Sequence, residues 1–146
     1  MATWSNPIYD RTLADVEYAK QQLEKQINNV DYKGCLNGAD LTRIDQNTQY
    51  LSEELIKLYY FNKIVPTGSW ASNNIVTASW LNQIFDNINK LLVAYQKPSN
   101  APAMPTTLLT YEQVNNIEKN LYLIKDMMDK MKASFKECGT FGCGEG

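Results

Sequence analysis

Apolar residues recur at helical spacing in four stretches of the chain, and each stretch begins close to a residue suited to cap a helix. The strongest pattern steps by three and four from Leu41 to Leu58, with Thr48 as its one polar member. No alternation of the kind that marks a strand extends over a comparable length. We therefore expect an all-α fold resembling a four-helix bundle, with helices over about residues 12–29, 38–62, 78–95 and 111–136.

Residues at the helix boundaries support this division. Thr12 is a fitting N-cap with Asp15 three positions later, and Thr110 with Gln113 forms a capping box for the last helix. Two of the connections are long and contain proline, and the first also contains glycine. Loops of this length in a compact domain usually carry function or lie against another surface, so two candidate segments are residues 63–76 and 96–109.

An internal repeat appears when the last three helices are aligned on their first apolar residue. Each has a capping residue four positions earlier, an isoleucine three positions later and an asparagine six positions later: Asn47, Asn87 and Asn120. An asparagine at this place falls on the edge of the apolar stripe, where its half-exposed amide can bind a neighbouring backbone. The alternative is chance in an asparagine-rich chain.

The last residues of the chain differ in composition from the rest. Four glycines stand among the final twelve residues, and glycine destabilises a helix, so we expect the last helix to end near Lys136. This predicts a helical domain over 1–136 and an extended arm over 137–146, flexible until it lies against another chain, with Phe141 as its apolar contact.

The three cysteines give a weak case for a metal site. Cys35, Cys138 and Cys143 can supply three thiolates, but a closed zinc site takes four ligands and the chain contains no histidine. A disulfide between the last two is sterically conceivable, although an odd number of cysteines does not indicate a closed disulfide framework. We therefore expect no metal and no cofactor.

Composition and charge exclude several classes of function. The chain has 146 residues, 44% hydrophobic and 21% charged, with a net charge of −2, which is typical of one soluble globular domain. Absence of histidine removes the commonest general base, and only Arg11 and Arg43 are arginines. No start resembling a signal peptide and no run long enough to span a membrane occurs. We expect no enzyme, no nucleic-acid partner and no membrane partner.

Aromatic residues gather at helix ends and in the expected loops. Such amphipathic rings often anchor protein interfaces, and the alternative is that they close the open ends of a small bundle. The candidate interface residues are Trp4, Tyr59, Tyr60, Phe61, Trp70 and Phe141.

Short motifs spread over most of the chain carry a family resemblance. They are Tyr9–Thr12, Leu36–Leu41, Asn47–Leu51, Tyr111–Asn115 and the ending Gly-Thr-Phe-Gly-Cys-Gly-Glu. Together they resemble a family of small virion proteins encoded beside tail genes in phages of low-GC Gram-positive bacteria. The resemblance implies a structural part of a phage particle (tail, baseplate or fibre-associated) and no catalytic residues.

The working hypothesis from the sequence is a structural subunit of a virion, assembled in the cytoplasm of the bacterial host. Its expected partners are other virion proteins and copies of itself. The first alternative is a tail module that binds glycans of the host surface through its aromatic loops. The second alternative is a cytosolic helical adaptor or regulator, which would be missing from purified particles.

Overall fold

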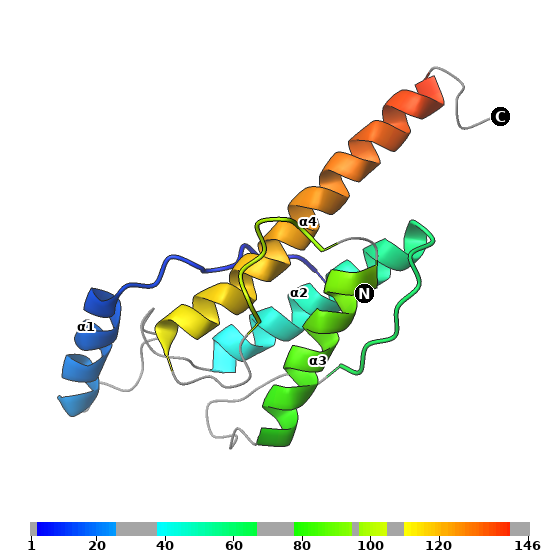
Figure 1. The fold of residues 1–146 in the computed structure, drawn as a ribbon. Coiled ribbons are helices and arrows are strands. Elements are labelled where there is room, and N and C mark those ends of the chain that lie inside the picture. Colours follow the sequence, from blue (N-terminus) through cyan, green and yellow to red (C-terminus); the bar gives the residue numbers. More distant parts are fainter. Residues whose placement is uncertain (1–2, 26–37, 67–77, 95–96, 105–109, 141–146) are drawn as a thin grey trace.

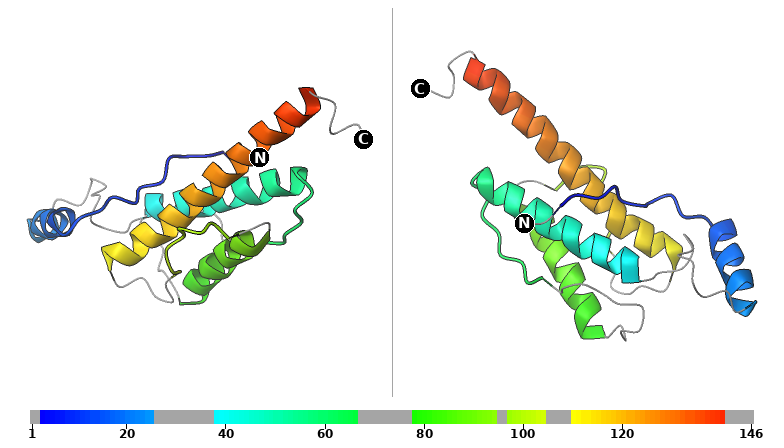
Figure 2. Two further views of the ribbon diagram at one scale, coloured as in Figure 1. Left: turned by 45° about the horizontal axis from the view of Figure 1, so that its top comes forward. Right: turned by 180° about the vertical axis from the view of Figure 1, so that it is seen from behind.

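A computed structural model describes residues 3–25, 38–66, 78–94, 97–104 and 110–140. Over these residues all regular structure is helical (Figure 1): α1 is Leu13–Glu24, α2 is Gly38–Lys57, α3 is Ala78–Ala94 and α4 is Tyr111–Thr140. The predicted all-α, bundle-like fold is confirmed. The extensive helix–helix contacts are those among α2, α3 and α4. α1 lies at one side of this bundle in every view (Figures 1 and 2).

The core forms where the apolar faces of α2, α3 and α4 meet. Its side chains come from the positions that the helical spacing predicts, and the most deeply buried are Leu51, Ile88, Ile117, Leu121 and Met128. Burying one such side chain contributes roughly 1.5–3 kcal/mol. The one polar position of the α2 stripe, Thr48, is also buried, because its hydroxyl donates to the carbonyl of Ile44 at 2.7 Å.

The predicted N-cap at Thr12 and the predicted capping box at Thr110 are both present, and the cap at Thr12 is also a capping box. At the start of α1 the Asp15 amide donates to the Thr12 hydroxyl, while the Thr12 amide donates to the Asp15 carboxylate. At the start of α4 the Gln113 amide donates to Thr110 Oγ1, and the Thr110 amide donates back to Gln113 Oε1. These boxes satisfy amide groups that the first turn of a helix leaves without partners.

Three helix ends differ from the sequence expectation. α1 ends at Glu24 rather than near residue 29, because it lacks the extensive packing that stabilises the other helices. α2 ends at Lys57 rather than near residue 62, because Tyr59 adopts a left-handed conformation with φ of 69°. α4 continues to Thr140, so residues 137–140 are helical and not part of an extended arm.

The longer α4 has a simple energetic reason. Gly139 is the one glycine between the expected and the observed end, and glycine in a helix costs only about 1 kcal/mol relative to alanine. The rest of the expected arm, residues 141–146, lies outside the described residues.

Extended segments run along the helices and are fastened to them by asparagines. Asn47 of α2 binds the backbone of Ser5 twice, accepting from its amide at 2.9 Å and donating to its carbonyl at 2.8 Å. Asn87 of α3 binds Val65 in the same way, at 3.0 and 2.7 Å. Asn120 of α4 donates to the carbonyl of Pro102 at 3.0 Å.

The asparagine repeat therefore ties neighbouring backbone to the bundle, as its position on the helices predicts. One detail of the expectation is wrong: the three asparagines are not half-exposed but at most 1% exposed, because the extended segments cover them. The Asn120 attachment is also incomplete. Since proline has no amide hydrogen, Pro102 cannot donate to Asn120 Oδ1, which is buried and has no partner among the described residues.

Candidate functional site

Both arginines of the chain lie in one cluster of charges between the segment 3–12, α2 and α4. Arg11 Nη1 lies 2.7 Å from Glu118 Oε2, and Arg11 Nη2 lies 3.2 Å from Asp40 Oδ1. Arg43 donates to both oxygens of Glu118 at 2.7 and 3.0 Å, and to Asp40 at 2.6 Å. The two positive and two negative charges balance, and the side chain of Glu118 is 0% exposed.

The electrostatics of this cluster favour the charged form of Arg43. Burial lowers the pKa of Arg43, but its hydrogen bonds and charge attraction to Glu118 and Asp40 outweigh this effect and raise the pKa above its ordinary value. Both carboxylates are engaged by guanidinium groups. The ion pairs therefore hold the segment 3–12, α2 and α4 together, and the role of the cluster is structural.

A second attachment holds the backbone of Arg11 against α4. Asn115 of α4 accepts from the backbone amide of Arg11 at 3.1 Å and donates to its carbonyl at 3.0 Å. One feature of the sequence points to this cluster, namely the presence of only two arginines. No sequence pattern indicates that residues more than 100 positions apart, such as Arg11 and Glu118, meet in the fold.

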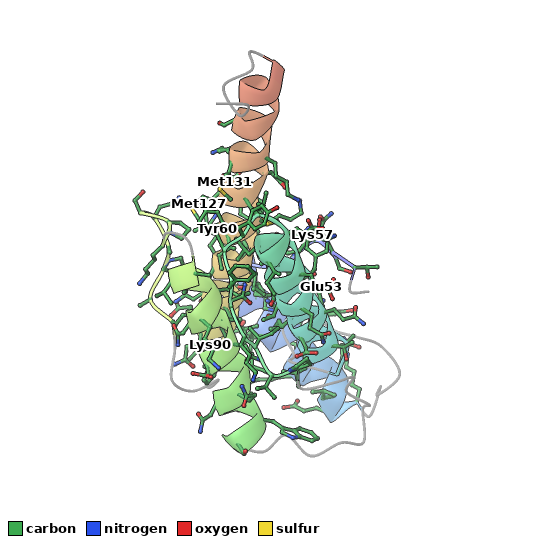
Figure 3. All side chains as sticks on the ribbon, turned by 90° about the vertical axis from the view of Figure 1, so that its right-hand side faces the viewer. Glu53, Lys57, Tyr60, Lys90, Met127 and Met131 are labelled. Atoms are coloured by element: carbon green, nitrogen blue, oxygen red, sulfur yellow. The ribbon has the colours of Figure 1, made fainter. Side chains whose placement is uncertain are left out.

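Two of the candidate interface residues close the core. Trp4 packs against the core, with its ring centre 5.8 Å from that of Tyr50 and Lys125 Nζ 5.5 Å from it. Tyr60 also packs against the core. Figure 3 labels Tyr60 and also Met131 of α4, which packs against the same core.

The other two described candidates are exposed, and the end of α2 explains why. The amide of Tyr60 donates to the carbonyl of Leu55 at 2.9 Å, and the amide of Tyr59 donates to that of Ile56 at 2.9 Å. This is the Schellman pattern, in which the residue with positive φ is usually glycine. Here it is Tyr59, whose side chain is 82% exposed, and Phe61 after it is 74% exposed.

The segment 60–66 and the last turn of α3 form an open groove beside these aromatic residues. Its lining comprises Phe61, Asn62, Lys63, Val65, Lys90, Val93 and Ala94, and its volume is about 530 Å³. Val93 is 75% exposed and Val65 is 50% exposed, so the lining is largely apolar with two lysines. Figure 3 views this end of the molecule and shows Lys90 on α3. We call this feature the Phe61 groove.

The position of the groove depends on the asparagine repeat. Because Asn87 fixes the backbone of Val65 through both its amide and its carbonyl, the side chains on either side of Val65 are held in place. Asn62 adds hydrogen bonds to Ser52 of α2 and to the carbonyl of Tyr60. The groove is thus built on a fixed backbone although its side chains face solvent.

α1 carries a second exposed apolar surface. Leu13 is 57% exposed and Leu23 is 43% exposed, and both lie on the same side of the helix as the half-buried Val16. The other candidates fall outside the described residues, namely Trp70, Phe141 and the thiol groups of Cys35, Cys138 and Cys143.

Among the described residues, no group of three or more metal-ligating side chains is found. No helix there has both the length and the apolar character needed to cross a bilayer.

Comparisons of the chain with protein-family models, with curated proteins and with solved structures find no match.

Proposed function

We propose that this protein is a non-catalytic structural subunit that contacts other proteins of a phage particle through the exposed surface at the end of α2. The observation that carries the proposal is the conformation of Tyr59. A non-glycine residue with positive φ costs roughly 1 kcal/mol, and here the cost comes without burial of the ring, which is 82% exposed. A conformation that costs stability and presents an aromatic ring to solvent is typical of a contact surface.

The neighbouring residues extend this surface. Phe61, Val65 and Val93 are all at least half exposed, on a backbone fixed by Asn87. Large apolar side chains grouped on a rigid support favour a protein partner, since their burial contributes binding energy with little loss of backbone entropy. The phage particle as the setting rests on the sequence motifs described above.

Substitution of Tyr59 has opposite expected effects on the stability of the protein and on its incorporation into particles. Tyr59→Gly relieves the positive φ, so we expect the free energy of unfolding to rise by about 1 kcal/mol. The same change removes the exposed ring, so we expect less of the protein in purified phage particles, measured by quantitative mass spectrometry. Ile56→Ala is the matched control, because Ile56 is an exposed apolar residue of α2 outside the groove lining.

Absence of the wild-type chain from purified particles would overturn the proposal. Binding of the isolated wild-type protein to host cell-wall polysaccharide, lost on Phe61→Ala, would replace it with the glycan-binding alternative. Normal incorporation of Tyr59→Gly would show that the end of α2 is not the contact surface.

A further inference from the structure

The helices α2, α3 and α4 begin at the same end of the bundle and run in broadly the same direction (Figures 1 and 2). The chain therefore has to return along the bundle between one of these helices and the next, and the segments 60–66 and 97–104 follow α2 and α3 in the chain. A third extended segment, 3–12, lies between α4 and α2, but it does not follow α4 in the chain. Its attachment to α4 is thus entirely noncovalent.

The site that holds this third segment is built by two helices. Asn47 of α2 binds the amide and the carbonyl of Ser5, and Asn115 of α4 binds the amide and the carbonyl of Arg11. The side chain of Arg11 forms buried ion pairs with a carboxylate of each helix, at 3.2 and 2.7 Å. We call this site the α2–α4 groove. Its contacts recognise the backbone and the one arginine of the segment, and any copy of the chain supplies both.

α1 has no part in the extensive contacts that hold the bundle together within the described ranges. It has 12 residues and spans about 18 Å, and residues 25–37 can span up to about 3.3 Å each. The connection from the segment 3–12 to α2 can therefore reach about 60 Å. Since a domain of this size has a radius of gyration of about 15 Å, the α2–α4 groove of an adjoining copy is within reach.

We infer that neighbouring copies of this chain exchange the segment 3–12, which then docks in the α2–α4 groove of the second copy. Exchange conserves the contacts between segment and groove, so the segment stabilises the bundle in either arrangement, and the cost is the freedom lost when two copies associate. A connection of this length gives the segment an effective concentration of about 1 mM at its own groove, so exchange requires copies packed at a comparable concentration. The inference concerns a different surface from the end of α2 and does not depend on the proposed function.

Isotope labelling tests the exchange in a chain with a single changed residue. A photo-reactive analogue of phenylalanine replaces Trp4, which packs against the core beside Tyr50 of α2 and so reports the docked position. Equal amounts of unlabelled and heavy-isotope-labelled chains are refolded together at about 1 mM, cross-linked and analysed by mass spectrometry.

We expect up to half of the cross-linked peptides to join residue 4 of one label to a bundle of the other label. The same mixture refolded at about 1 μM is the control and should give like labels only, because each segment then meets its own groove first. Like labels alone at the higher concentration overturn the inference.

Complementary variants test the same docking without a cross-link. Arg11→Ala weakens the segment and leaves the groove intact, whereas the double variant Asn47→Ala with Asn115→Ala weakens the groove and leaves the segment intact. Circular dichroism and thermal unfolding check that each folds. An equimolar mixture should form a dimer as the concentration rises to about 1 mM, because one intact segment meets one intact groove, and each variant alone should sediment as a monomer.

The matched control is the double variant that also carries Arg11→Ala. It removes the last intact segment from the mixture, which should then stay monomeric. A mixture of the first two variants that stays monomeric, or a dimer that persists in the control mixture, overturns the inference.

Discussion

The segments 3–12 and 60–66 are attached to the bundle by the same device and serve it in different ways. In each, one asparagine of a helix binds both the amide and the carbonyl of one residue, Ser5 in the first and Val65 in the second. The first segment then turns Trp4 and Arg11 toward the bundle. The second leaves Phe61 and Val65 facing solvent.

The comparison shows that attachment through the backbone leaves the side chains of a segment available for other roles. Because the asparagine recognises only main-chain atoms, the side chains of the attached segment are not needed to hold it. In the segment 3–12 they add a buried cluster of charges, and in the segment 60–66 they form an exposed groove. We expect the first segment to determine stability and the second to determine binding. Substitution of Glu118 and of the two asparagines tests this division, and substitution of Pro102 and Glu54 tests other attachments to the bundle.

Glu118→Gln should have the largest effect on stability. It removes the negative charge of the buried carboxylate that pairs with both Arg11 and Arg43, so we expect the free energy of unfolding to fall by about 4 kcal/mol. Chemical denaturation provides the measurement. Asp126→Asn, which breaks the exposed pair with Lys130, is the control and should cost less than about 1 kcal/mol. A loss for Glu118→Gln as small as that of the control contradicts the role assigned to the cluster.

Asn47→Ala and Asn87→Ala compare the two attachments directly. Each removes the two hydrogen bonds that attach its segment to the helix, each worth about 1 kcal/mol, so we expect each variant to cost about 2 kcal/mol. Native-state hydrogen exchange should accelerate at Ser5 in the first variant and at Val65 in the second. Only the second should lower incorporation into phage particles, because only it loosens the Phe61 groove. Equal effects of both on incorporation would show that the groove does not depend on Asn87.

Pro102→Ala tests the incomplete attachment of the third extended segment, 97–104. An alanine amide can donate to Asn120 Oδ1 and satisfy it, which is worth about 1–3 kcal/mol, while loss of the proline ring costs roughly 0.4–1 kcal/mol. We expect a net stabilisation of about 1 kcal/mol, measured by thermal unfolding. Ala101→Gly, one position earlier, gives the effect of added chain freedom alone. Destabilisation by Pro102→Ala would mean that its amide does not point at Asn120.

The smallest effect concerns the ion pair that joins the end of α2 to α4. Burial raises the pKa of Glu54, but its hydrogen bond and charge attraction to Lys132, with a further contribution from Lys57, hold it below its ordinary value of 4.5. Since the folded-state pKa is the lower one, this stabilisation is complete above pH 4.5 and is lost as the pH falls through the folded-state pKa. We expect about 0.5 kcal/mol from this pair.

Unfolding of the wild type and Glu54→Gln between pH 3 and pH 7 measures this contribution. The wild type should be more stable near neutral pH, and the difference should shrink toward pH 3. A difference that stays constant over this range would show that Glu54 does not contribute through its charge.

The parts of the fold that depend on local order were predictable from sequence. The faces of α2, α3 and α4 followed from spacing within each helix, and the N-cap at Thr12 and the capping box at Thr110 followed from residues three positions apart. The asparagine repeat predicted that backbone would be bound, although not which segment. The end of α2 was missed because a tyrosine stands where a Schellman turn usually has glycine.

The candidate site was only partly predictable. Aromatic character at a helix end predicts a contact role for Tyr59 and Phe61, which are exposed, and equally for Trp4 and Tyr60, which pack against the core. The sequence shows that an aromatic residue lies at a helix end, but it does not show whether the ring faces the core or solvent. The groove was missed altogether, because Val93 and Val65 come together only when Asn87 fixes the second segment on α3.

The pairing of Arg11 with Glu118 also has a consequence for synthesis of the chain. The two residues are separated by 107 positions, so the N-terminal segment can reach its final place only after α4 has left the ribosome. Until then α2 carries Asp40 and Arg43 without their counterpart from α4. The segment 3–12 is therefore synthesised before α4 and takes its final place only after it, because this contact closes a loop of more than 100 residues.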